Sequence, residues 1–169
     1  MKIILGRMRW FFVLIFPVLI IKEMPSTFLE DYIYGKEQEK LCFRTIKRYF
    51  GGNLKHNDDE FAPFDFEGSN MKIEMKSRKI LSTEFDTAMI KSLKVDRCVD
   101  ETADCFLVFK YLDIFYAIEY DRVKFAKYKR KLMKIEDRPD KKETWEWRTF
   151  IPMTDMEVIK RYPIECLID

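Results

Sequence analysis

Two acidic residues and a lysine that could share one chemical task lie in the stretch 61–79, FAPFDFEGSNMKIEMKSRK. The stretch predicts two strands joined by a turn at 68–70. Because alternate residues of a strand face the same way, Glu74 and Lys76 share one face, and Asp65 can lie across the hairpin from Glu74. Two carboxylates and an ammonium group on one face are costly to bury without a task. A divalent metal ion with an activated water is the task that fits them best.

The rest of the chain predicts the elements that would position these residues. In chain order they are a helix over 30–50, hairpin strands over 60–66 and 71–78, a helix over 83–98, strands over 105–111, 115–120 and 145–151, and a short helix over 154–160. Gly51 and Gly52 are a stop signal for the first helix. The near-continuous apolar run 105–111 is typical of a strand covered on both faces. We therefore expect an α/β fold with a mixed central β-sheet flanked by helices.

The composition argues against several functional classes. The 5 glycines form no glycine-rich loop, which disfavours nucleotide binding of the P-loop or dinucleotide type. The 4 cysteines contain no CxxC pair, so a zinc site is not expected, and we interpret them as reduced core residues. The only histidine, His56, stands in the polar loop 53–60 and is expected at the surface, without a catalytic triad around it. The net charge of +2 means that any nucleic-acid surface must be a local patch.

One such patch is offered by the stretch 122–134, which carries seven basic residues and no acid. These are Arg122, Lys124, Lys127, Lys129, Arg130, Lys131 and Lys134. The stretch is either a solvated helix face or a surface that contacts several phosphates. Trp145 and Trp147 share a face of the next strand, where they could pack in a core or interface or stack on bases.

Residues 10–21, WFFVLIFPVLII, form an apolar run behind two arginines. The run is shorter than the about 20 apolar residues of a membrane span, and no small-residue cleavage site follows it. Residues 1–23 are therefore a signal or anchor segment, a core or partner-binding segment, or residues upstream of a true start at Met24. The last interpretation is favoured because the globular pattern begins just after Met24, and we expect a single domain over 24–169.

The order of these features resembles the PD-(D/E)XK nuclease superfamily, which includes Holliday junction resolvases, restriction enzymes and viral or phage nucleases. The resemblance covers roughly residues 35–120 and is closest to small resolvase-like and phage- or virus-encoded members. The matching elements are Gly35 and Glu39 on the first helix, Asp65 on the first hairpin strand, and Glu74-Met75-Lys76 on the second. The Pro-Asp dipeptide of the family is interrupted here as Pro63-Phe64-Asp65, and only the Asp does chemistry in the family.

The resemblance implies a restriction-endonuclease-like core and a metal site within it. By match, Asp65 and Glu74 bind Mg²⁺, with Mn²⁺ as a substitute, and the main-chain carbonyl of Met75 is a further ligand. Glu39 supports the metal shell or a second metal. The chemistry agrees, since Mg²⁺ takes oxygen ligands and needs only one or two carboxylates besides water and substrate phosphate.

The resemblance also assigns basic residues to the site. Lys76 would orient or activate the attacking water and stabilise the charged phosphate. Lys94, on the next predicted helix, would aim a further basic group at the site. Glu67 shares a strand face with Asp65 and stays open as an alternative ligand, although Gly68 suggests that the strand is already turning there.

The expected function is thus Mg²⁺-dependent hydrolysis of phosphodiester bonds by a DNA endonuclease of resolvase-like type, with DNA and possible homodimerisation as its partners. Its catalytic residues would be Lys76, Glu39, Asp65 and Glu74. The composition, rich in Lys, Ile and Phe, would suit a viral or phage genome of low GC content, and hence an intracellular protein of the host cytoplasm or nucleus. The alternatives are a non-catalytic nucleic-acid-binding protein of the same fold, or a membrane-anchored or secreted protein if 10–21 is an anchor.

Overall fold

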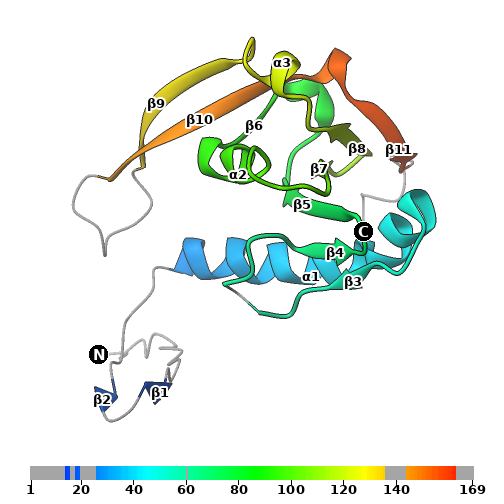
Figure 1. The fold of residues 1–169 in the computed structure, drawn as a ribbon. Coiled ribbons are helices and arrows are strands. Elements are labelled where there is room, and N and C mark those ends of the chain that lie inside the picture. Colours follow the sequence, from blue (N-terminus) through cyan, green and yellow to red (C-terminus); the bar gives the residue numbers. More distant parts are fainter. Residues whose placement is uncertain (1–13, 16–17, 20–25, 60, 136–143, 163–169) are drawn as a thin grey trace.

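One long helix lies along one face of a six-stranded sheet, and a three-stranded sheet lies on the other side (Figure 1). The computed structural model describes residues 14–15, 18–19, 26–59, 61–135 and 144–162. Its helices are α1 (Ser26–Phe50), α2 (Ser92–Arg97) and α3 (Arg122–Phe125), with 3₁₀ turns η1 (Ser82–Glu84) and η2 (Met153–Asp155). The expected α/β class is confirmed.

The central sheet has the strand order β11-β8-β7-β5-β4-β3. Its strands are β3 (Lys55–His56), β4 (Phe66–Gly68), β5 (Met71–Ser77), β7 (Asp104–Lys110), β8 (Ile114–Glu119) and β11 (Glu157–Arg161). Only β5 and β7 pair in parallel, and the other neighbours are antiparallel. The predicted mixed central sheet is therefore confirmed, and β5, which carries the Glu-Met-Lys motif, lies inside it.

The second sheet has the antiparallel order β6-β10-β9, with β6 (Thr87–Lys91), β10 (Thr144–Pro152) and β9 (Lys129–Ile135). Together with α2 and α3 it covers the face of the central sheet opposite α1 (Figure 1). The central sheet is thus flanked by a long helix on one face only. Short helices and a second sheet, which the sequence did not predict, cover the other face.

Strand β7 explains why the central sheet is buried on both faces. Its Val108 belongs to the core cluster on the α1 side, with Cys42 and Ile46 of the helix. Its Leu107 and Phe109 belong to the cluster on the opposite side, beneath the second sheet. Alternate residues of one strand thus enter two cores, which accounts for its continuous apolar sequence.

Helix α1 ends where the double glycine predicted. Gly51 and Gly52 have positive φ angles of 73° and 67°, which residues with a Cβ rarely adopt. The Gly51 N–H still donates to the Lys47 carbonyl at 3.0 Å, closing the last turn. The buried face of the helix carries Cys42 and Ile46, whereas Leu41 is 72% exposed.

Two expected helices are wrong. In place of a helix over 83–98, the chain forms η1, then strand β6, then the six-residue helix α2. The strand alternation decides the outcome, because Ala88 and Ile90 are buried, while Phe85 and Leu93 of the supposed helical stripe are exposed. In place of the helix over 154–160, strand β11 pairs with β8 at the edge of the sheet. Both strands gain their hydrogen bonds from distant partners, which local propensity does not reveal.

Two further boundaries differ from the expectation. The basic stretch 122–134 is not one helix, since α3 ends at Phe125 and strand β9 begins at Lys129. The first hairpin strand starts only at Phe66, so Asp65 directly precedes it.

Part of the apolar run 10–21 belongs to the described residues, as the paired strands β1 (Leu14–Ile15) and β2 (Val18–Leu19). The remaining residues of 1–23, and with them the three interpretations of that segment, lie outside the described residues. No helix in the described ranges has the length and apolar character needed to cross a membrane.

The core assignment predicts different costs for one substitution at two leucines. Leu107 is fully buried and Leu41 is 72% exposed. We expect Leu107→Ala to lower the free energy of unfolding by about 2–5 kcal/mol, because it leaves a cavity between the sheets. Leu41→Ala should change it by less than about 0.5 kcal/mol. Urea denaturation followed by circular dichroism measures both, and equal losses would contradict the assignment.

Candidate active site

The acidic residues of the predicted motif meet in one cleft of about 340 Å³ between α1, the β4–β5 hairpin and the second sheet. Its acidic lining residues are Asp31, Glu39, Asp59, Asp65 and Glu74. Its basic lining residues are Lys36, Lys76, Lys91, Lys94 and Arg148. The cleft thus brings together the four predicted catalytic residues, Glu39, Asp65, Glu74 and Lys76, and the predicted basic residue Lys94.

Asp65 is held at the cleft by the hairpin. The register pairs Phe66 with Ile73, which brings Asp65 beside Glu74. One Asp65 carboxylate oxygen accepts a hydrogen bond from the Met75 N–H at 2.8 Å. Burial raises the pKa of Asp65 above its ordinary value of 3.8, and the negative Glu39 adds to the rise, while the Met75 N–H lowers it.

Glu67, the alternative to Asp65, lies outside the cleft. It pairs with Lys72 across the hairpin, and the Lys72 ammonium lies 3.1 Å from a Glu67 carboxylate oxygen. Asp65 precedes the regular strand, so the alternation that placed the two acids on one face does not reach it.

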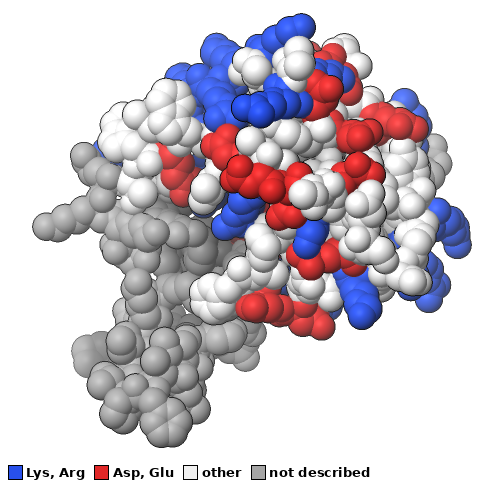
Figure 2. All heavy atoms as spheres, viewed as in Figure 1, with Lys and Arg blue, Asp and Glu red and all other residues white. Residues whose placement is uncertain are grey.

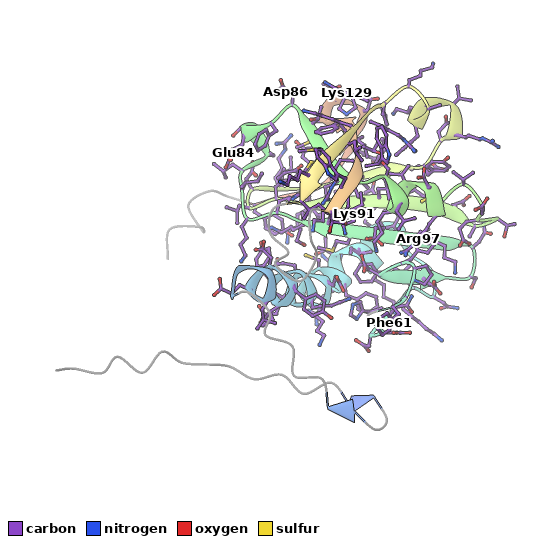
Figure 3. All side chains as sticks on the ribbon, turned by 90° about the vertical axis from the view of Figure 1, so that its left-hand side faces the viewer. Phe61, Glu84, Asp86, Lys91, Arg97 and Lys129 are labelled. Carbon is purple, nitrogen blue, oxygen red and sulfur yellow. The ribbon has the colours of Figure 1, made fainter. Side chains whose placement is uncertain are left out.

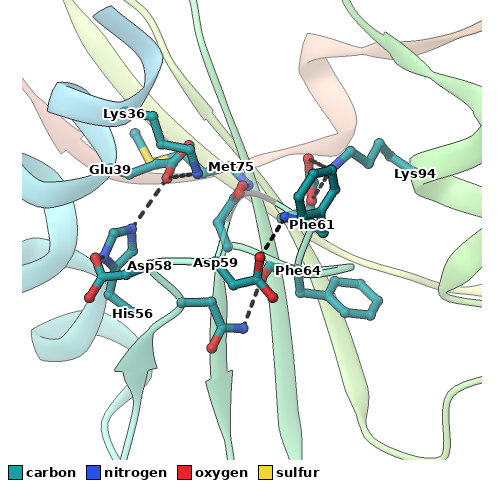
Figure 4. Close-up of polar contacts among 12 residues, drawn as sticks. Lys36, Glu39, His56, Asp58, Asp59, Phe61, Phe64, Met75 and Lys94 are labelled. Carbon is teal, nitrogen blue, oxygen red and sulfur yellow. Dashed lines mark hydrogen bonds and ion pairs between the residues drawn. The ribbon is translucent and has the colours of Figure 1, made fainter. Parts of the chain in front are cut away.

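Glu74 is the most deeply buried acid of the cleft, with 6% of its surface exposed. Burial, together with the negative charge of Asp65, raises the pKa of Glu74 to about 8, although Lys94 acts in the opposite direction. The Lys94 ammonium lies 2.8 Å and 2.9 Å from the two Glu74 carboxylate oxygens (Figure 4). Helix α2 therefore places a positive charge next to the most deeply buried carboxylate of the cleft.

Glu39 lies on α1, and its carboxylate is in contact with two nitrogen groups, one from α1 and one from β3 (Figure 4). The Lys36 ammonium donates to its Oε2 at 2.9 Å, and His56 Nε2 lies 3.2 Å from the same oxygen. The other ring nitrogen, His56 Nδ1, lies 3.1 Å from Asp58. The His56 ring also packs near Phe66, 5.2 Å between centroids.

The expectation that His56 is a surface residue is therefore wrong, since only 12% of its side chain is exposed. Strand β3 pairs His56 with Phe66, which draws the ring under α1. The only signal in the sequence was its place between Glu39 and Asp65, and that was too weak to use.

Lys76 stands at the rim of the cleft among other cations. The residue keeps an exposed surface, yet loss of hydration around the ammonium group lowers its pKa, and Arg78 and Arg148 lower it further. Arg148 comes from β10, and its guanidinium lies 2.8 Å from a Glu146 carboxylate oxygen as an ion pair. Lys91, at the end of β6, also lies 2.8 Å from Glu146. The sequence did not predict Arg148 or Lys91, because β6 and β10 bring them to the cleft from outside the motif.

The donor set of the cleft fits a hard divalent cation. Among the described residues, no group of three or more His, Cys, Asp or Glu side chains lies close enough to hold a metal ion as it stands. Asp65, Glu74 and Glu39 nevertheless supply oxygen donors to one cleft, and a cation would relieve the burial and repulsion that raise the pKa values of Asp65 and Glu74. Met75 lines the same cleft.

The basic stretch lies away from the cleft, over α3 and β9 (Figure 2). All seven of its basic residues are exposed except the half-buried Lys124. Arg130 and Lys124 form ion pairs with acids of neighbouring elements, with 2.7 Å between Arg130 and Asp96 and 3.7 Å between Lys124 and Asp155. None of the seven lines the cleft, so this patch and the acidic cleft are separate surfaces.

Comparison with protein-family models, with curated proteins and with solved structures finds no match. The functional argument therefore depends on the geometry of the cleft and on the chemistry of its residues.

The crowded carboxylates predict that neutralising Asp65 stabilises the metal-free protein. The pKa of Asp65 is raised in the folded state, so folding binds protons and stability falls as pH rises through that pKa. Asp65→Asn keeps an oxygen for the Met75 N–H but removes the charge. We expect the free energy of unfolding of Asp65→Asn to exceed that of the wild type by about 0.5–2 kcal/mol at pH 8, and this difference should vanish below pH about 4.

Thermal unfolding in a chelator at several pH values measures this gain. Asp86→Asn is the matched control, because Asp86 is exposed and outside the cleft, and it should leave stability unchanged. A loss of stability in Asp65→Asn at pH 8 would contradict the repulsion inferred here.

Proposed function

We propose that the protein is a metal-dependent nuclease that hydrolyses phosphodiester bonds of nucleic acid, most suitably DNA. The observation that carries the proposal is the convergence of Asp65, Glu74, Glu39 and Lys76 in one cleft, from α1, the hairpin and the central strand β5. Few tasks other than metal and phosphate chemistry require three carboxylates and several cations to share a cleft of this size.

The proposed roles follow from the position of each side chain. Asp65 and Glu74 would hold Mg²⁺ or Mn²⁺ with the Met75 carbonyl, and Glu39, fixed by Lys36 and His56, would support that shell or a second ion. The bound ion would lower the pKa of a water and offset charge on the phosphate.

The cations of the cleft would do the remaining work. Lys76, whose pKa is lowered, would orient the attacking water and take up its proton more readily in its neutral form. Arg148 and Lys91 line the same cleft, where they would offset charge on the phosphate in the transition state. A metal ion bound to Glu74 would replace the Lys94 ammonium beside that carboxylate, and Lys94 would then be free to contact the phosphate.

We further propose that the fold is a restriction-endonuclease-like core of the resolvase type. The supporting features, in chain order, are the acid-bearing helix α1, the β4–β5 hairpin with its acids, the short helix α2 and the parallel strand β7, with β3 inserted before the hairpin and η1 and β6 before α2. A homodimer on branched DNA would suit this type.

One observation favours a second candidate, a non-catalytic nucleic-acid-binding protein. Lys94 contacts both Glu74 oxygens, so the buried carboxylate already has a compensating charge without a metal ion. Such a protein would bind DNA equally well in a chelator and would cleave nothing.

The central test is cleavage of plasmid, linear and branched DNA by the purified protein. We expect cleavage with Mg²⁺ or Mn²⁺ and none in a chelator. Asp65→Asn, Glu74→Gln and Lys76→Ala should each lower the rate by about 100-fold or more, because each removes a group that acts on the reacting phosphate.

Glu67→Gln is the matched control for the choice of acid. It removes only the ion pair with Lys72, and the rate should stay within about threefold. Cleavage that persists in a chelator and in Asp65→Asn would refute the proposed mechanism. Loss of activity in Glu67→Gln with activity kept in Asp65→Asn would move the metal site to Glu67.

The basic stretch should supply salt-dependent affinity. Lys129 and Lys131 are exposed on β9, and reversing both to Glu removes two phosphate contacts. We expect the slope of log affinity against log salt to become shallower by about 2. Fluorescence anisotropy with labelled DNA measures the slope. Lys40→Glu with Arg48→Glu changes the net charge equally on α1 and should leave the slope unchanged, and equal effects of both pairs would contradict a local binding surface.

A further inference from the structure

Two tryptophans stand exposed on the ribbon formed by β9 and β10. Trp145 and Trp147 are 55% and 56% exposed. The register places Trp147 opposite Leu132, which is 41% exposed, and Trp145 opposite Lys134. We name the surface formed by Trp145, Trp147 and Leu132 the tryptophan face.

On β10, the two tryptophans lie on the same strand face that packs into the core further along the strand. Alternate residues of β10 share a face, so Trp145 and Trp147 follow on from Thr149 and Ile151, both fully buried. The ribbon therefore extends a buried face beyond the core and leaves two large aromatic rings open to a partner. Isolated surface residues need no explanation, but two adjacent tryptophans with a leucine opposite form a contiguous apolar surface.

This surface leads into the acidic cleft. A hollow of about 510 Å³ lies next to it and is lined by Trp147, Leu93 and Arg130, among others. Lys91 lines both this hollow and the acidic cleft. Figure 3 shows Lys91 in the middle of this side of the molecule, between Lys129 above and Phe61 below. A chain molecule that passes over Trp147 thus reaches the buried carboxylates by way of Lys91.

The charge of the ribbon decides which partner fits. On the side of the tryptophan face, β9 contributes two basic residues, Arg130 opposite Thr149 and Lys134 opposite Trp145, whereas Lys129 and Lys131 alternate onto the other side of the ribbon. A second copy of the chain docked face to face would bring the like charges of Arg130 and Lys134 together, which is unfavourable. A polyanion with flat apolar groups meets both requirements, because its phosphates match Arg130 and Lys134 and its bases match the indole rings.

We propose that the tryptophan face stacks unpaired bases of a nucleic-acid strand and guides that strand past Lys91 into the acidic cleft. The bases must be unpaired because a duplex covers the faces of its bases with their neighbours, which leaves no ring for tryptophan to stack on. This inference rests on the proposed function and narrows its substrate class to nucleic acid with a single-stranded segment next to the scissile phosphate.

The test is binding of the full-length protein, in a chelator, to a labelled single-stranded oligonucleotide and to a blunt duplex of equal length. Anisotropy should show that Trp145→Ala with Trp147→Ala weakens single-strand binding about tenfold or more and changes duplex binding by less than about threefold. Trp145→Phe with Trp147→Phe, which keeps aromatic rings, should restore most of the single-strand affinity. Because both residues are exposed, the melting temperature of all variants should match the wild type, which shows that they fold.

The outcomes separate this inference from the proposed function. If the alanine variant still binds the single strand with wild-type affinity, the proposed role of the tryptophan face is overturned, even if the wild type cleaves DNA with Mg²⁺. Loss of binding in the alanine variant supports the face, even if no DNA is cleaved with any metal ion. A dimer that the alanine variant converts to a monomer in sedimentation, with unchanged single-strand binding, would assign the face to a second copy and overturn the inference.

Discussion

The burial of one carboxylate beside another is the constraint on which the cleft depends. Glu74 sits on an interior strand of the central sheet with almost no exposed surface, and Asp65 lies next to it. Two such groups cannot both be ionised there unless positive charge is close by. The surrounding elements supply it, since α2 presents Lys94, α1 presents Lys36, and β10 presents Arg148. The cleft is therefore a site where the fold holds unfavourable charges in place, as sites of chemistry commonly do.

The parts of the fold that could be predicted are those whose signals are local. Gly51 and Gly52 mark the end of helix α1, and the turn at 68–70 marks the hairpin between two stretches of alternating residues. The unbroken apolar run of strand β7 indicates that the strand is buried on both faces. In each case the residues that decide the structure are neighbours in the sequence.

Strands β6, β9 and β11 could not be predicted because their partners are distant. The stretch 84–98 offers a helical spacing and a strand spacing at once, and only β10 decides in favour of the strand by pairing with Ala88 and Ile90. The basic stretch has no apolar alternation to mark β9, whose hydrogen bonds also come from β10. Part of the site could not be predicted for the same reason. Glu39, Asp65, Glu74 and Lys76 follow a recognisable order, whereas His56 reaches Glu39, and Arg148 reaches the cleft, only through strand pairing.

The strand order also fixes when the cleft can be completed. The motif acids lie between residues 39 and 74 and Lys94 follows twenty residues after Glu74, but β6 forms its ladder with β10, which spans residues 144–152. Pairing over so long a separation in sequence has a high entropic cost and forms late in folding. A chain emerging from the ribosome therefore carries its acids and Lys76 well before it acquires Arg148 and the wall that β10 completes. The order of synthesis therefore delays assembly of the cleft until β10 has been made.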